Sequence, residues 1–251
     1  MLISIYPHHL TEPMEINDSL VTVIILSLLA GLAMPLGAFV AQITSHRSLW
    51  LGSELKHGVI AFGGGALLSA VALILVPQGI EHQSISMATI YFCGGGFAFL
   101  LIDVLLYRIK TAASQLVAML SDFVPEALAL GAAVALGSDS IVLLAILMVL
   151  QNLPEGFNAF HEINKTSRMA NHRLIFTFVL LSLIGPIAGI SGYMWLADKP
   201  QAVSAIMLFA AGGILYSVFQ DIAPQAKLEK HWLPAFGAII GFMLGIIGHM
   251  F

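Results

Sequence analysis

Two short stretches, SDFVPEALALG and QNLPEGFNAF, place a proline and polar residues within otherwise apolar sequence. Asp122 and Glu126 of the first stretch are four residues apart, as are Gln151 and Glu155 of the second, so each pair lies on one face of a helix. The proline before each glutamate frees a carbonyl one turn back and loosens the helix beside the carboxylate. Carboxylate and amide oxygens are ligands of divalent metal ions. The pattern therefore predicts a cation site shared by two helices.

The composition of the whole chain is that of a membrane protein. Of 251 residues, 59% are hydrophobic and 10% are charged, whereas a soluble domain carries about 25% charged residues. A carboxylate near the bilayer centre costs roughly 2.5–3.5 kcal/mol, so Asp122, Glu126, Glu155 and Asp221 together cost on the order of 10 kcal/mol. Bound cations or protonation would offset this cost. Interhelical hydrogen bonding is the structural alternative, but two matching Pro-Glu pairs favour an ion site.

The depth of the two pairs in the membrane is similar. Asp122 lies 12 residues from Lys110 and Glu155 lies 10 residues from Lys165, which places both carboxylates roughly 15–18 Å from the same end of their helices. If the two helices are antiparallel neighbours, these carboxylates are level with each other. Glu126 and Gln151 then also lie close to a common level. Four oxygen-bearing side chains are therefore expected to converge near the midplane.

A polar stripe continues from the second pair toward the end of its helix. Asn158 and Glu162 follow Gln151 and Glu155 at steps of three and four residues, which keeps all four within about 60° around the helix. Asp103, one turn from a tyrosine and an arginine, is expected to form a pair at the membrane interface. The polar residues expected along a transport pathway are Gln115, Asn158, His161, Glu162 and Ser217, with Glu81 and His82 at an outer entrance.

Eight apolar stretches of about 20 residues, each long enough to cross a bilayer, follow one another along the chain. Short loops separate them, so we expect a single all-α membrane domain over 19–251, preceded by an outward-facing tail over 1–18. The expected helices cover residues 19–42, 57–79, 86–107, 112–137, 139–163, 173–197, 201–224 and 232–250.

The basic residues predict how this bundle is oriented. Nine of the ten Lys and Arg residues lie in or beside the odd-numbered loops, and only Lys199 lies elsewhere. Loops rich in Lys and Arg remain in the cytoplasm. Both termini are therefore expected to be extracytoplasmic, in a protein of the plasma membrane. A count of eight helices makes this alternation consistent, so the charge pattern supports the count.

An internal repeat relates the second and seventh expected helices. FGGGALLSAVALILVPQ at 62–78 and FAAGGILYSVFQDIAPQ at 209–225 share six identical residues in 17 positions, at a constant offset of 147. Because the second and seventh helices cross the membrane in opposite directions, the two copies are inverted. Inverted repeats are typical of secondary transporters, whose binding sites lie near the bilayer midplane.

The two Pro-Glu stretches resemble motifs of the ZIP (Zrt- and Irt-like protein) family of divalent-metal transporters. D-F-V-P-E-A at 122–127 and Q-N-L-P-E-G at 151–156 are similar to the H-N-x-P-E-G type of motif on that family's fourth and fifth helices. Asp221, three residues before a proline, is similar to an acidic residue on its seventh helix. The resemblance implies eight helices, with an inverted repeat of helices 1–3 and 6–8 around central helices 4 and 5. It also implies a first metal site of Asp122, Glu126, Gln151 and Glu155, and a second of Asn152, Asp221 and the shared glutamates.

The chain departs from the family motif wherever the family has histidine. Asp122 replaces the first His, Phe123 replaces the Asn that follows it, and Gln151 replaces the second His. Phe123 removes one ligand of the second site, so we expect one metal ion rather than two. A shell made only of oxygen atoms shifts the preference from zinc toward Mn²⁺, Mg²⁺ or Fe²⁺, although zinc also accepts carboxylates.

The function predicted from these residues is the inward transport of a divalent metal cation of the zinc, iron or manganese class. The loss of every site histidine motivates an alternative, a ZIP homologue without transport activity that acts as a metal sensor or membrane partner subunit. A proton-linked carrier of another solute is a third interpretation, which the two Pro-Glu motifs disfavour. No enzyme activity is expected, because no nucleophile or acid–base set lies outside the cluster. The expected partners are the metal ion as cargo and the lipid bilayer, with a homodimer left open and neither a cofactor nor a nucleic acid expected.

Overall fold

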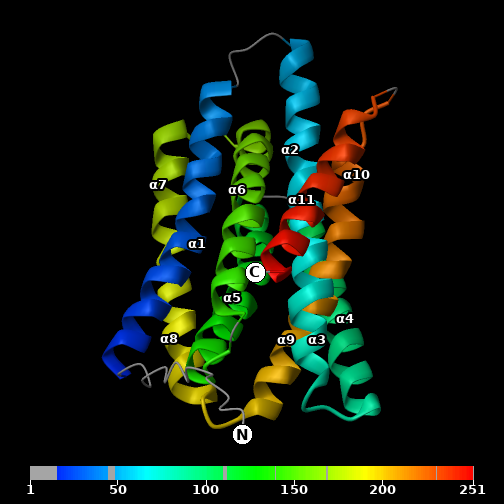
Figure 1. Cartoon of the computed structure of the whole chain (residues 1–251). Coiled ribbons are helices and arrows are strands. Elements are labelled where there is room, and N and C mark those ends of the chain that lie inside the picture. Colours follow the sequence, from blue (N-terminus) through cyan, green and yellow to red (C-terminus); the bar gives the residue numbers. More distant parts are fainter. Residues whose placement is uncertain are drawn as a thin grey trace, which may run out of the picture.

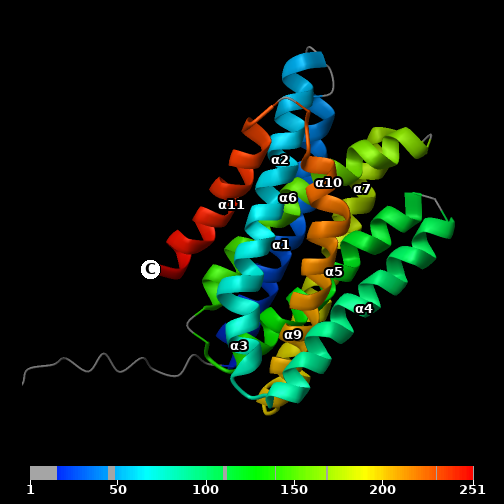
Figure 2. The same ribbon diagram turned by 90° about the vertical axis from the view of Figure 1, so that its right-hand side faces the viewer.

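The computed structural model describes residues 16–44, 49–109, 112–138, 140–167, 169–229 and 231–250, and these residues form helices and no strand. Eight helical stretches in this part of the chain are long and apolar enough to cross a membrane, which confirms the predicted number. They form a single bundle (Figures 1 and 2). Most of the tail expected over 1–18 lies outside the described residues.

Each membrane span consists of one, two or three consecutive helical elements. Several spans are interrupted, so thirteen helical elements make up eight crossings. The spans are α1 (Ile16–Thr44); α2, η1 and α3 (Leu49–Ala70, Val71–Leu75 and Val76–Ile80); α4 (Ile85–Ile109); α5 (Ala112–Ala135); α6 (Ile141–Thr166); α7 and α8 (Asn171–Ser182 and Ile184–Leu196); α9, η2 and α10 (Pro200–Ser217, Val218–Ile222 and Ala223–Ala226); and α11 (Leu233–Met250).

Prolines lie next to the interruptions of three spans. Pro77 and Pro224 follow the π-helical segments η1 and η2, whose wider turns accommodate the carbonyls that a proline one turn later cannot pair. Pro186 lies three residues after Leu183, where the sixth span breaks into α7 and α8. η1 and η2 lie 147 residues apart, the same offset as that between the two similar sequence stretches.

Glycines that face backbone carbonyls bring the spans close together. A Cβ atom on Gly65 of α2 would collide with the carbonyl of Ala238 on α11, and one on Gly212 of α9 would collide with the carbonyl of Phe92 on α4. α2 with α11 and α4 with α9 are among the most extensive helix contacts, as are α1 with α6 and α5 with α8. Small residues at such crossings permit the close packing that holds membrane helices together. α5 and α6 also pack against each other, so they join the outer helices at the centre of the bundle.

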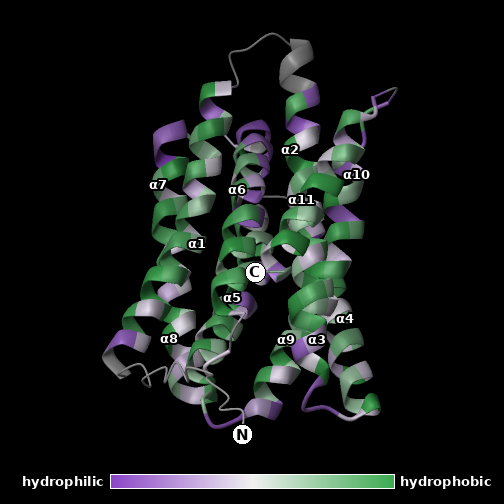
Figure 3. Cartoon of the chain, viewed as in Figure 1, coloured by the Kyte–Doolittle hydropathy of each residue, from purple (hydrophilic) through white to green (hydrophobic). Residues whose placement is uncertain are grey.

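The two ends of the bundle differ in charge. Because consecutive spans run in opposite directions, α1, α4, α6 and α10, which precede the odd-numbered loops, end on the same side of the bundle, shown at the top of Figure 1. We call it the basic end, because nine of the ten Lys and Arg residues lie in or beside these loops. Figure 3 shows mainly hydrophobic residues along the spans and hydrophilic ones mainly toward their ends. Hydrophilic residues within a span are therefore exceptions, and such residues usually mark a functional site.

Candidate functional site

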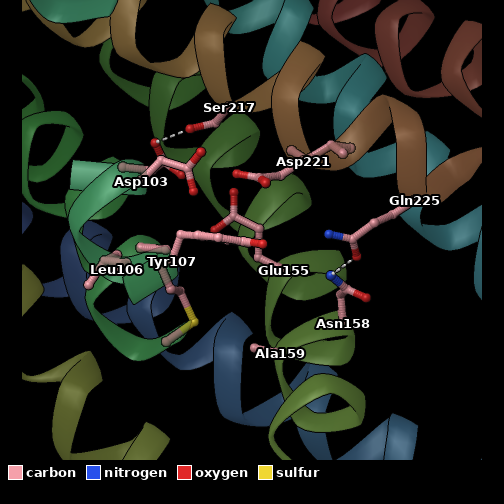
Figure 4. Close-up of a pocket in the computed structure, with 13 residues that line it drawn as sticks. Asp103, Leu106, Tyr107, Glu155, Asn158, Ala159, Ser217, Asp221 and Gln225 are labelled. Atoms are coloured by element: carbon pink, nitrogen blue, oxygen red, sulfur yellow. Dashed lines mark hydrogen bonds between the residues drawn. The ribbon is translucent and has the colours of Figure 1, made fainter. Parts of the chain in front are cut away.

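A cavity of ≈ 250 Å³ opens between four spans in the half of the bundle nearer the basic end. Asp122 lies ten residues after the start of α5 and Glu155 lies eleven before the end of α6, so both are about 15 Å from that end. The cavity, which we call the acidic cavity, is shown in Figure 4. It is lined by Asp103, Leu106, Tyr107, Ala118, Met119, Asp122, Glu155, Asn158, Ala159, Ser217, Asp221, Ile222 and Gln225.

Four carboxylates from four different spans line the acidic cavity: Asp103, Asp122, Glu155 and Asp221. No Lys, Arg or His is among its described lining residues. Both carboxylate oxygens of Glu155 are buried without a hydrogen-bond partner among the described residues, and Figure 4 shows Glu155 and Asp221 among the residues that line the cavity. A buried carboxylate without donors or a counter-charge is costly. The cavity is therefore suited to a ligand that brings positive charge.

Neighbouring hydroxyl groups hold two of these carboxylates. The Tyr216 hydroxyl donates a hydrogen bond to Oδ2 of Asp103 at 3.0 Å, and the Ser217 hydroxyl donates one to Oδ1 of Asp122 at 3.4 Å. Both hydroxyls come from the last turn of α9. Each leaves the other oxygen of its aspartate available, so the span that carries Asp221 also orients two carboxylates of neighbouring spans.

Glu126 and Gln151 lie together, and neither is among the residues that line the acidic cavity. Nε2 of Gln151 donates a hydrogen bond to Oε2 of Glu126 across the contact between α5 and α6. The two side chains are 1% and 0% exposed, and neither lines the cavity. Antiparallel packing thus brings each residue level with its expected neighbour. Of the four expected ligands, Asp122 and Glu155 line the cavity, whereas Glu126 and Gln151 are paired with each other and do not line it.

Asn152 faces a different helix from the one the expected second site requires. Its Nδ2 donates a hydrogen bond to the carbonyl of Ala30 on α1 at 2.9 Å, and its side chain is buried. Asn152 is not among the residues that line the acidic cavity. Asp221 does line that cavity, so the structure does not bring Asn152 and Asp221 together.

Two of the expected pathway residues lie in the acidic cavity. Ser217 donates to Asp122 as described, and Nδ2 of Asn158 donates to Oε1 of Gln225 at 2.8 Å, which links α6 to α10 (Figure 4). Oδ1 of Asn158 is buried and has no partner among the described residues. The expected site at Gln115 lies outside the described side chains.

The remaining expected pathway residues lie outside the acidic cavity. The His161 ring packs edge-on against Phe157 at 4.9 Å between ring centroids. Glu162 forms ion pairs with Lys165 on its own helix at 2.9 Å and with Lys56 of α2 at 3.6 Å. At the opposite end of the bundle, a separate cavity of ≈ 430 Å³ is lined by Gln78, Glu81, His82, Ser138, Ser140 and Ser204, together with apolar residues.

Asp103 is the cavity carboxylate that the sequence reasoning did not assign to the site. It was expected to pair at the membrane interface, but it bonds to Tyr216 and lines the acidic cavity together with Tyr107. The position of Asp103 in the sequence indicates this placement, because an acidic residue six positions inside an apolar span generally faces the bundle interior rather than lipid.

The carboxylates are close enough to share a cavity but are not gathered around one point. Among the described residues, no three Asp, Glu, His or Cys side chains are arranged to hold a metal ion. An ion bound by three of these carboxylates therefore requires side chains or spans to move closer together. No protein-family model matches the chain. No curated protein matches it either.

Proposed function

We propose that this protein transports a divalent metal cation across a membrane, in the manner of the ZIP family that its sequence resembles, with the acidic cavity as the binding site. The observation that carries this proposal is a set of four carboxylates in one intramembrane cavity, with no basic side chain among the described lining residues and both oxygens of Glu155 unpartnered. A divalent cation neutralises two carboxylates, which removes much of their cost in the membrane.

Asp122 and Glu155 are the proposed central ligands, because they face the same cavity at equal depth on the two central helices. Asp221 and Asp103 supply further oxygen atoms from the side of α4 and η2. Glu126 and Gln151 support this site from behind, by fixing α5 against α6 through their hydrogen bond. A set of oxygen ligands without His or Cys favours Mn²⁺, Mg²⁺ or Fe²⁺ over Zn²⁺.

The direction of transport is proposed from charge and cavity position. The Lys and Arg distribution favours a cytoplasmic basic end with extracytoplasmic termini, and the proposed location is the plasma membrane. The acidic cavity lies in the half nearer that end, which supports release of the cation from this cavity into the cytoplasm. Release of a cation into the cytoplasm completes inward transport.

An inverted repeat of the first three and last three spans is part of the proposal. Three observations support it: the 147-residue sequence offset, the same offset between η1 and η2, and the matching contacts of α2 with α11 and α9 with α4. Gly65 and Gly212, which are also 147 residues apart, make equivalent contacts with facing carbonyls. Repeats of this kind allow alternating access, in which one group of spans moves against the other around the site.

A sensor or partner subunit without transport activity is the second candidate. It is favoured by the absence of three preorganised metal-ligating side chains among the described residues and by the lack of site histidines. Transport and sensing both require metal binding at the acidic cavity, but only transport requires net flux.

Metal uptake into proteoliposomes tests the proposal. The purified protein is compared with Glu155→Gln and Asp122→Asn over a panel of Mn²⁺, Fe²⁺, Co²⁺, Zn²⁺ and Cd²⁺, with Glu229→Gln in an exposed loop as the matched control. Uptake by the wild type and the control, with loss in both cavity variants, is expected. Unchanged uptake by Glu155→Gln would refute the assigned site. Metal binding without uptake by any folded form would favour the sensor.

A further inference from the structure

A further cavity lies beside the seventh span, near the basic end. Its volume of ≈ 390 Å³ falls in the usual range of small-molecule sites, about 300–1,000 Å³. It is enclosed by α2, by η2 with α10, and by α11, and we call it the side cavity. Its walls are almost entirely apolar and mostly small, formed by Ala61, Gly64, Leu68, Val218, Ile222, Ala223, Ala226, Leu228, Pro234, Ala235 and Ala238.

Charged residues lie at one end of this apolar space. Lys227 and His231 line the side cavity in the segment between α10 and α11. His231 pairs with Glu54 of α2 at 3.3 Å, whereas Lys227 is exposed. The sequence of this segment, KLEKH, has two lysines and one glutamate, so its balance is basic. An apolar chamber that ends at a lysine matches a molecule with a hydrocarbon body and an anionic head.

The position of the side cavity identifies where such a molecule comes from. α11 covers the cavity and lies at one edge of the bundle (Figure 2), and many of its large apolar side chains, including Phe236, Ile239 and Met243, are exposed as in a lipid-facing helix. Lys227 and His231 lie where the spans end, at the level of lipid headgroups. If the basic end is cytoplasmic, this level is that of the leaflet that contains anionic lipids.

We propose that the side cavity binds an anionic phospholipid, with an acyl chain between α2, η2 and α11 and with the phosphate at Lys227. The occupied cavity lies directly behind the acidic cavity, because Ile222 lines both. Ile222 packs tightly against α2 between the two cavities, since a Cβ atom on Gly64 would approach Cγ2 of Ile222 to 2.9 Å. The lipid therefore packs against the segment that carries Asp221.

Brominated lipids provide a direct test, because bromine on an acyl chain quenches tryptophan fluorescence at short range. Trp232 is exposed and lies between His231 and Pro234, which both line the side cavity. With Trp50 and Trp195 replaced by phenylalanine, Trp232 is the only tryptophan left in the chain. The protein is reconstituted in nanodiscs of unlabelled phosphatidylcholine, and brominated phosphatidylglycerol or brominated phosphatidylcholine is titrated in.

Brominated phosphatidylglycerol is expected to quench Trp232 at a concentration about fivefold lower than brominated phosphatidylcholine, since one lysine near the membrane surface contributes on the order of this preference. Lys227→Gln removes the preference, whereas Lys199→Gln, at the opposite end of the bundle, preserves it. Ala235→Leu fills the cavity and weakens quenching by both lipids. Equal quenching by the two lipids, or a preference that survives Lys227→Gln, overturns the proposal. These readouts do not depend on metal transport, so they stand or fall separately from the proposed function.

Discussion

The hydrogen bond between Gln151 and Glu126 is expected to be one of the strongest single links between the two central helices. It joins α5 to α6, and its two side chains are 0% and 1% exposed, so water cannot replace either partner. Gln151→Leu places an apolar side chain in this position and removes the donor. The glutamate is then left in the bundle interior without its hydrogen-bond partner from α6.

The size of this effect follows from the burial of the pair. Hydrogen bonds to charged groups contribute about 1.5–3 kcal/mol in soluble proteins. Interhelical hydrogen bonds in membrane proteins average about 0.6 kcal/mol and reach about 1.7 kcal/mol. Because this pair is fully buried and includes a carboxyl group, we expect a coupling free energy near the upper membrane value, about 1.5 kcal/mol.

A double-mutant cycle measures this coupling. Glu126→Leu, Gln151→Leu and the double variant are unfolded with sodium dodecyl sulfate in mixed micelles, with circular dichroism as the readout of helix content. The half-buried Asn158–Gln225 pair, at 2.8 Å, is the matched control and is expected near the membrane average of about 0.6 kcal/mol. A coupling for Glu126–Gln151 no larger than that of the control would refute the reasoning.

Four further predictions concern packing, ligands and the basic end. Gly156→Val is expected to destabilise the protein by about 1–3 kcal/mol in the same unfolding assay, because its Cβ atom would collide with the Met34 carbonyl; Gly94→Ala, with nothing within 4 Å, should be close to neutral. Asn152→Leu loses its bond to Ala30, so stability falls by about 1 kcal/mol. Metal uptake by folded Asn152→Leu remains, and its loss would restore this residue as a ligand. Asp103→Asn weakens metal binding in isothermal titration, whereas affinity equal to wild type would place Asp103 outside the site. Glu162→Gln lowers stability by less than about 1 kcal/mol, an effect that should shrink at high salt because the pair with Lys56 is partly exposed.

The architecture could be predicted largely because membrane helices follow a simple physical rule. Backbone groups in lipid must be paired within a helix, so apolar stretches of about 20 residues specify both the element and its length. The sequence does not reveal how a span is interrupted. The break at Leu183 and the wide turns of η1 and η2 depend on how neighbouring helices accommodate the carbonyls near Pro186, Pro77 and Pro224.

The candidate site could be predicted only in part, for geometric reasons. Periodicity correctly placed Asp122 and Glu155 on facing sides of adjacent helices, and it placed Glu126 beside Gln151. Periodicity along one helix carries no information about which neighbour lies opposite each face. Asn152 therefore proved to face α1, and Asp103, on a helix not considered as part of the centre, proved to face the cavity.

The absence of basic groups from the described lining of the acidic cavity determines how the site responds to the membrane potential. Moving one elementary charge through the full potential is worth about 2.3 kcal/mol per 100 mV. With its carboxylates ionised, the empty cavity is strongly negative, and a bound divalent cation cancels two of those charges. If the cavity transports a cation as proposed, an inside-negative potential acts more strongly on the empty site than on the loaded one and pushes its carboxylates outward. In the proposed transport cycle, the return of the empty site therefore depends more strongly on voltage than the movement of the loaded site.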